Sequence, residues 1–204
     1  MSSSQPIKFE SPDRGEETAR ADLYGLLATL YAAPPSQDLI DTIASARSEG
    51  NGVLEQAWAS LVEACREAEA EALREEYEAL FIGVGKPEVM LYGSYYLSGF
   101  LMEKPLAALR TDLARLGLER DASVNESEDH FAMLCEVMRY LIASNEMAHA
   151  GLAEEKQFFA THIQPWALEM CEAIAAHPEA RFYRVVTGLA RIFLEVEMQA
   201  FDMS

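Results

Sequence analysis

The chain has 204 residues, half of them hydrophobic, so it is long enough to bury a core and does not have the composition of a disordered polymer. Lys and Arg number 16 against 34 Asp and Glu, and the resulting formal charge of −18 argues against a nucleic-acid partner because it repels phosphates. Such a charge suits a basic peptide as partner, but it also serves simply to keep a helical protein in solution.

The N-terminus is expected to be a disordered tail over residues 1–15, and it lacks the basic and apolar regions of a signal peptide. No run approaches the roughly 18 consecutive apolar residues of a membrane span. Cys65, Cys135 and Cys171 have no metal-binding or redox spacing, and each lies within an apolar helical pattern. These features predict core thiols in a reducing compartment, and therefore a cytoplasmic protein.

The first half of the chain is predicted to be helical throughout. Apolar periodicity indicates a helix over residues 16–31, and Ser36 is placed to cap a short helix that ends near residue 47. Residues 53–81 form one long helix, or two helices with a break. Within them, residues 63–78 carry seven glutamates and two arginines, a charge run typical of a solvated face.

The stretch that follows interrupts this pattern. Glycines and a proline break any long helix between Ile82 and Phe100, yet the stretch is rich in large apolar and aromatic residues. We expect a groove or a hinge there, with the hinge over residues 82–104 joining two helical halves. A hinge of this kind favours domain swapping, so the predicted state is a monomer or a homodimer.

Further helices are predicted over residues 105–116, 125–148, 153–163, 165–176 and 178–201, with Gly117 closing the first. No segment alternates with the period of two that a strand requires. The sequence therefore predicts an all-α fold of about eight to ten helices, forming a single helical domain over residues 16–204.

The segment Asn125-Glu126-Ser127-Glu128-Asp129-His130 is predicted to open the helix over residues 125–148. Asn125 can cap that helix, Glu128 can reach back to it, and carboxylates suit the positive end of a helix dipole. Capping does not account for His130, because a helix N-terminus disfavours a protonated imidazole. A capping role and a binding role are therefore both open for this segment.

Enzymatic motifs are absent from the sequence. It contains no GxGxxG, GxxxxGK[ST], GxSxG or HExxH pattern. A di-iron bundle needs two Glu-x-x-His motifs and two more glutamates, and only Glu146-Met147-Ala148-His149 has this spacing. We therefore expect neither a metal, nor a cofactor, nor catalysis.

Four elements between residues 77 and 166 resemble the TorD/DmsD/NarJ family, the cytoplasmic maturation chaperones of bacterial molybdoenzymes. They are Tyr77-Glu78-Ala79-Leu80-Phe81-Ile82-Gly83-Val84-Gly85, similar to Y-x-x-L-F-x-G-x-G; Leu91-Tyr92-Gly93-Ser94-Tyr95-Tyr96, similar to P-Y-x-S-x-Y; Glu126-Ser127-Glu128-Asp129-His130, similar to E-P-x-D-H; and Phe158-Phe159-Ala160-Thr161-His162-Ile163-Gln164-Pro165-Trp166, similar to F-x-x-H-x-x-P-W. Leu91 and Ser127 stand where the family has Pro.

The resemblance implies a chaperone that binds the twin-arginine signal peptide and the apo form of a molybdoenzyme, delaying export until the cofactor is inserted. The leader's apolar part would lie in an aromatic groove, its arginines would meet Asp129 and Glu126, and His130 would orient Asp129 or bond a peptide carbonyl. The implied peptide-binding residues are Tyr77, Leu80, Phe81, Gly83, Gly85, Tyr92, Ser94, Tyr96, Glu126, Asp129 and His130.

Other interpretations stay open at this stage. The apolar residues of the groove fit a core equally well, Gly83 and Gly85 fit a simple turn, and the His162 to Trp166 element fits a structural role. A helical small-molecule or nucleotide-binding regulator and an assembly subunit of a membrane reductase are alternative functions. A formate dehydrogenase, a sulfoxide or amine-oxide reductase and a nitrate reductase are equally compatible clients.

Overall fold

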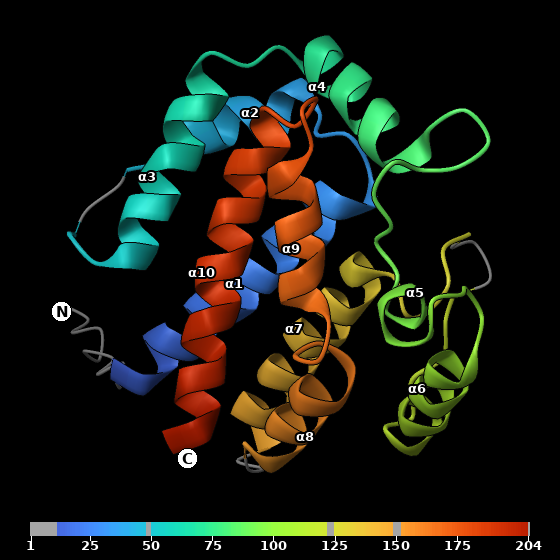
Figure 1. Cartoon of the computed structure of the whole chain (residues 1–204). Coiled ribbons are helices and arrows are strands. Elements are labelled where there is room, and N and C mark those ends of the chain that lie inside the picture. The colour runs from blue at the N-terminus through green and yellow to red at the C-terminus, as the bar shows by residue number, and fades with distance from the viewer. Residues whose placement is uncertain (1–11, 48–49, 122–124, 149–151, 204) are drawn as a thin grey trace, which may run out of the picture.

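The computed structural model describes residues 12–47, 50–121, 125–148 and 152–203. Within these ranges the predicted all-α fold is confirmed, because they form ten α-helices, one short π-helix and no β-strand. The helices of Figure 1 are α1 (Pro12–Ala32), α2 (Gln37–Ala44), α3 (Val53–Arg66), α4 (Ala70–Tyr77), the π-helix η1 (Glu78–Ile82), α5 (Gly93–Ser98), α6 (Lys104–Arg115), α7 (Phe131–Ala148), α8 (Ala153–His162), α9 (Ala167–Ala176) and α10 (Phe182–Met203).

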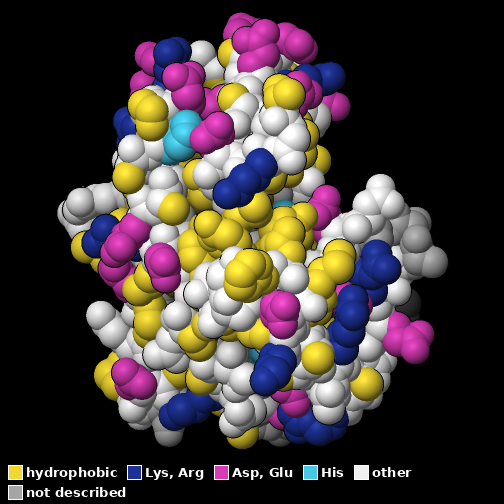
Figure 2. Space-filling view, turned by 45° about the vertical axis from the view of Figure 1, so that its right-hand side comes forward, with side chains coloured by type: hydrophobic (Ala, Val, Ile, Leu, Met, Phe, Trp, Pro, Cys, Tyr) yellow, Lys and Arg dark blue, Asp and Glu magenta, His cyan; other side chains and the backbone are white. Residues whose placement is uncertain are grey.

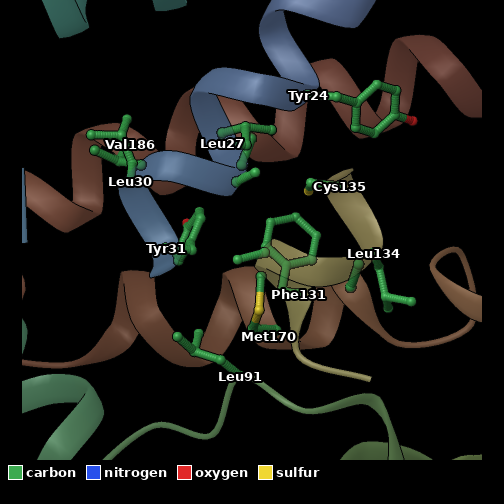
Figure 3. Packing of buried hydrophobic residues seen from close by; sticks show 14 of the residues in the cluster. Tyr24, Leu27, Leu30, Tyr31, Leu91, Phe131, Leu134, Cys135, Met170 and Val186 are labelled. Atoms are coloured by element: carbon green, nitrogen blue, oxygen red, sulfur yellow. The ribbon is translucent and has the colours of Figure 1, made fainter. Parts of the chain in front are cut away.

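A single hydrophobic core draws on helices from both sides of the predicted hinge. Helix α1 packs along α7, while α10 packs against α3, α9 and α4. Figure 3 shows side chains of α1 facing those of α7 at close range. The ring of Tyr31 meets the ring of Phe131 edge-on, with 5.1 Å between centroids. The two predicted halves therefore share one interior.

An ion-pair cluster joins α1 to α8 and α10, nearer the N-terminal end of α1. The guanidinium of Arg20 lies 2.7 Å from Glu197 of α10 and 3.1 Å from Glu155 of α8, and it also pairs with Glu17. The Tyr24 hydroxyl donates a hydrogen bond of 3.0 Å to Glu197. The side chains of Glu155 and Glu197 are buried. Their negative charges are therefore removed from water, and pairing with Arg20 offsets the free-energy cost of that burial.

Local sequence signals account for several helix ends. The Ser36 hydroxyl accepts the Leu39 N–H at 3.3 Å, which confirms the predicted cap of α2. Gly117 adopts a φ of 72°, and the next residue returns a 2.9 Å bond to the Leu113 carbonyl, ending α6 as predicted. The region 53–81 holds two α-helices, because the chain leaves helical geometry at Glu67 and Glu69.

Three predicted helix starts are wrong by four residues or more. One is the start of α10, which is Phe182 instead of the predicted residue 178. Helix α1 begins at Pro12, so the predicted tail is shorter than residues 1–15, and its first 11 residues lie outside the described chain. Helix α7 begins at Phe131, six residues after Asn125. The predicted hinge contains the short helix α5. It begins at Gly93 and is followed by Gly99, so it is too short to show the apolar period by which helices are predicted.

The charge run is a solvated face with one exception. Its other glutamates are exposed, but the Glu76 carboxylate accepts three main-chain N–H groups at the start of α10. The donors are Arg181 at 2.8 Å, Phe182 at 3.1 Å and Tyr183 at 2.8 Å. Glu76 thus caps a helix more than 100 residues away in the sequence.

The three cysteines are buried and carry free thiols, which confirms their predicted place in the core. None of the described helices combines the length and the apolar character that crossing a membrane requires.

Candidate functional site

The second and third of the motif elements meet through their main chains. An isolated antiparallel bridge pairs Tyr92 with His130. On one side of the bridge the Gly93 N–H donates to the Asp129 carbonyl at 2.9 Å, and a second main-chain bond of 2.8 Å lies on the other side. We call this pairing the junction. It fixes the start of α5 against the start of α7.

Within the junction, Asp129 caps α5 rather than its own helix. One carboxylate oxygen accepts the Ser94 N–H at 2.9 Å and the Ser94 hydroxyl. The other oxygen accepts the hydroxyl of Ser127, the residue that replaces the family's proline. Asp129 is 4 % exposed, so this buried carboxylate has its hydrogen bonds supplied by the two serines.

His130 is the residue that caps α7, in place of Asn125. Its Nδ1 accepts the Ala132 N–H at 3.1 Å, and its carbonyl accepts the N–H of Leu134 at 3.1 Å. Burial lowers the pKa of His130 to about 4, against the opposing charges of Glu126 and Asp129. The imidazole is therefore neutral at neutral pH, with its proton on Nε2, which removes the conflict with the helix dipole. The two serines hold the Asp129 carboxylate, so its position is explained without His130, and a bond from His130 to a peptide carbonyl stays a prediction.

The other two carboxylates of the motif also have partners. The Tyr92 hydroxyl donates to Glu126, and burial together with this bond raises the pKa of Tyr92. Arg110 of α6 forms a bidentate pair with Glu128, at 3.0 and 2.9 Å. This hydrogen bonding lowers the pKa of Glu128. The acidic motif therefore serves to join α5, α6 and α7.

The last motif element packs beneath α5. The Trp166 ring stacks on Tyr96 with 5.4 Å between centroids, and its Nε1 donates to the His162 carbonyl at 2.7 Å. A Cβ atom at Gly93 would lie 2.9 Å from this nitrogen, so only glycine fits there. The structural role expected of this element is confirmed. The His162 side chain nevertheless pairs with Asp112 of α6 at 2.8 Å instead of capping its own helix.

Part of the predicted aromatic groove belongs to the core. Tyr77, Leu80 and Phe81 are almost fully buried, and the Tyr77 hydroxyl donates to the Tyr31 carbonyl at 3.1 Å. For these three residues the groove-lining prediction is wrong, because packing against α1 and α10 covers them. Tyr92 and Tyr96 are half-buried at the junction.

Gly83 and Gly85 form the turn after η1. Gly83 has a φ of 63°, and a Cβ atom there would lie 2.1 Å from the Lys86 carbonyl oxygen. Gly85 has a φ of 89°. Both positions need glycine for conformational reasons, with no ligand required to explain them.

Exposed apolar side chains flank the junction, most of them within the stretch from Ile82 to Phe100 where the sequence predicts a groove or a hinge, although none of them is among the predicted binding residues. These side chains lie at the end of η1 or α5, or in the few residues after each, and their exposed fractions range from 43 % for Leu97 to 107 % for Val84. Figure 2 shows that hydrophobic side chains also form a band across the middle of the face drawn there. The apolar surface, as we define it, consists of Ile82, Val84, Leu97, Phe100, Leu101 and Met102.

Metal ligands do not gather in the described part of the chain: no group of three or more His, Cys, Asp or Glu side chains there could hold an ion. The side chain of Glu146 and all of His149 lie outside the described residues.

Comparisons with known proteins agree with the motifs. A family model described as the nitrate reductase delta subunit matches residues 50–172. The chaperone protein TorD of Aliivibrio fischeri is 28 % identical over 127 residues, covering 58 % of this chain and 59 % of that protein. The Tat proofreading chaperone DmsD of Salmonella typhimurium is 30 % identical over 126 residues, covering 61 % and 59 %. The match therefore spans about three fifths of either relative.

A longer match and a solved structure complete the comparison. The chaperone protein TorD of Vibrio cholerae is 25 % identical over 203 residues, covering 90 % of this chain and 92 % of that protein. A protein of Archaeoglobus fulgidus, described as a redox enzyme maturation protein, has the same fold, with a TM-score of 0.58, 18 % identity, and coverage of 94 % and 99 %. Because the family model spans more than half of it, the chain belongs to the nitrate reductase delta subunit family, the TorD/DmsD/NarJ family that its motifs predict.

Proposed function

We propose that this protein is a cytoplasmic chaperone that binds the twin-arginine signal peptide and the apo form of a molybdoenzyme, delaying export and assisting cofactor insertion. Membership of the family supports this role, as do relatives that are themselves named chaperones. The protein acts by binding, without a catalytic step and without a cofactor of its own.

The observation that carries the proposal is the apolar surface. Six large hydrophobic side chains are exposed in two short segments on either side of the junction. Large hydrophobic side chains exposed in this number mark a candidate docking site for a protein or a peptide. The leader's apolar segment would cover these side chains, with half-buried Tyr92 and Tyr96 beside it, while the junction holds the two segments in place.

Calorimetric titration tests this role. The probe is a synthetic peptide with two consecutive arginines followed by an uncharged stretch of leucine, alanine and glycine. We expect the protein to bind it, and the double variant Phe100→Ser/Met102→Ser to lose about tenfold in affinity or more, because two exposed apolar contacts disappear.

The matched control is Met203→Ser, which changes an exposed methionine at the end of α10, away from the junction. It should bind the peptide like the unmodified protein. No binding by the unmodified protein, or equal binding by all three proteins, would refute the proposed role.

The description of the family also favours a related second role, assembly of a reductase whose catalytic subunit is the partner. Co-purification with a subunit that lacks its leader, together with failure to bind the arginine peptide, would select this alternative.

A further inference from the structure

The carboxylates of the acidic motif are poorly placed to receive the leader's arginines. Glu126, Glu128 and Asp129 are all engaged within the protein, by a tyrosine, an arginine and two serines respectively. Asp129 is also buried, so an incoming guanidinium would have to displace its present donors. The cationic end of a leader therefore needs carboxylates elsewhere.

A cleft of about 800 Å³ lies between α4 and the start of α10. This volume falls within the usual range of roughly 300–1,000 Å³ for binding pockets. Between its glutamates the lining is apolar, with small, half-buried and buried side chains, so it can accommodate the aliphatic stem of a long side chain. This apolar part of the lining, the floor of the cleft, includes Ala64, Ala68, Leu73, Phe182 and Val185.

The rim of this cleft is strongly acidic. Glu67, Glu69, Glu75 and Glu179 are exposed there, and in the described chain no ion pair is recorded for their carboxylates. Glu76 also lines the cleft, although its oxygens are occupied by the N-terminus of α10. Five glutamates against the single arginine of the lining, Arg181, give a formal charge of 1 − 5 = −4.

One wall of the cleft is close along the chain to the first residue of the apolar surface. Ala79 lines the cleft, and η1 carries the chain from there to exposed Ile82 within one turn. Figure 2 shows acidic side chains gathered at the end of the molecule where Figure 1 places α4, above the hydrophobic band. An extended peptide with a cationic end and an apolar segment matches this succession of charge and hydrophobicity.

We propose that the acidic cleft between α4 and α10 binds the arginine-bearing end of the client's leader, while its apolar segment covers the apolar surface. This assignment rests on the proposed chaperone function and names the partner of a second part of the binding surface. The guanidinium groups pair with rim carboxylates in a forked geometry that lysine does not reproduce, and their stems lie on the apolar floor.

The test compares the triple variant Glu67→Gln/Glu69→Gln/Glu75→Gln with a control of equal charge change, Glu16→Gln/Glu154→Gln/Glu172→Gln, whose glutamates are exposed elsewhere. Each is titrated with the arginine peptide and with the same peptide carrying two lysines, at low and at physiological salt. We expect the rim variant alone to lose about tenfold in affinity for the arginine peptide and most of its salt dependence. It should also lose most of its preference for arginine over lysine.

Melting curves establish that the variants are folded, and Glu179→Gln, in the opposite wall of the cleft, provides an independent variant that should weaken binding in the same way. If the rim variants bind like the control while Phe100→Ser/Met102→Ser does not, the cleft assignment is overturned and the chaperone role stands. A loss of affinity in Asp129→Asn, with none in the rim variants, would show that the leader's arginines bind the acidic motif and not the cleft. If no protein binds either peptide, both proposals fall.

Discussion

At the scale of single residues, His130 shows how a motif residue can serve the fold through its neutral form. Its ring nitrogen accepts a main-chain N–H at the start of α7, which a protonated imidazole cannot do. Burial keeps the ring neutral by holding its pKa near 4. Folding therefore opposes protonation of this side chain.

A dependence of stability on pH follows from this pKa. Because the folded pKa of about 4 lies below the unfolded value of about 6.5, His130 costs no stability above pH 6.5. As the pH falls from 6.5 toward 4, the unfolded state binds the proton first, and the free energy of unfolding should fall by up to about 3 kcal/mol. The variant His130→Asn retains a capping side chain that does not titrate, so its curve should be flatter.

Urea denaturation of both proteins at pH 7.5 and pH 4.5 measures this difference. The carboxylates titrate in both proteins, so only the gap between the two curves reports on His130. Parallel losses in the two proteins would mean that the imidazole is already protonated in the folded state.

The sequence located the Asp129-His130 pair but not the role of either residue. The motif marks the position, and both side chains do cap helices, as the local pattern suggests. The residue of α5 that Asp129 caps, Ser94, lies 35 residues earlier, so no local rule could identify it. Asn125 is a better cap by residue type than His130, and this preference misplaced the start of α7.

At the scale of elements, the start of α10 depends on one side chain of α4. Replacing Glu76 by Ala leaves three main-chain N–H groups without their carboxylate, two of them in partly buried bonds. We expect the free energy of unfolding to fall by about 2 kcal/mol, and amide exchange to accelerate at Phe182 and Tyr183.

Glu78→Ala is the matched control, since Glu78 is an exposed glutamate of the same charge run. Its effect should be about 0.5 kcal/mol or less. Chemical denaturation compares the two variants, and equal losses would show that the cap contributes nothing specific.

Periodicity predicts the long elements well and the short ones poorly. The ends of α2 and α6 follow from Ser36 and Gly117, whose preferences are local. Helix α5 has six residues and therefore less than two turns of pattern to read. Its stability comes from Asp129 and from the stack of Tyr96 on Trp166, contacts that lie far apart in the sequence.

At the scale of the whole molecule, Arg20 ties α1 to α8 and α10. Removing it with Arg20→Met would leave two buried carboxylates without their cation, so we expect a loss of about 3–5 kcal/mol. Arg191→Ala is the control, because it breaks an exposed pair within one helix and should cost about 0.5 kcal/mol or less. Thermal and urea unfolding measure both variants, and a cost below about 1 kcal/mol for Arg20→Met would contradict this account.

No sequence pattern could have revealed that cluster, since its paired side chains Arg20 and Glu197 are 177 residues apart. The pairing of helices in the shared core could not be predicted either. The apolar periodicity of the helices predicts a common core but does not indicate which helices pack against one another. Domain swapping through residues 82–104 stays a prediction. The contact of Tyr31 with Phe131 shows that an exchange would have to divide and rebuild the central packing.

The buried thiols give this architecture three internal reporters. Cys65, Cys135 and Cys171 belong to α3, α7 and α9, and burial raises the pKa of Cys65 to about 11 and that of Cys171 to about 12. An alkylating reagent needs an accessible thiolate, so it must wait until the helix that carries the thiol separates from its neighbours. The rate at which each cysteine is alkylated therefore measures how often the helix that carries it separates from the rest of the molecule. No engineered label is needed for this measurement.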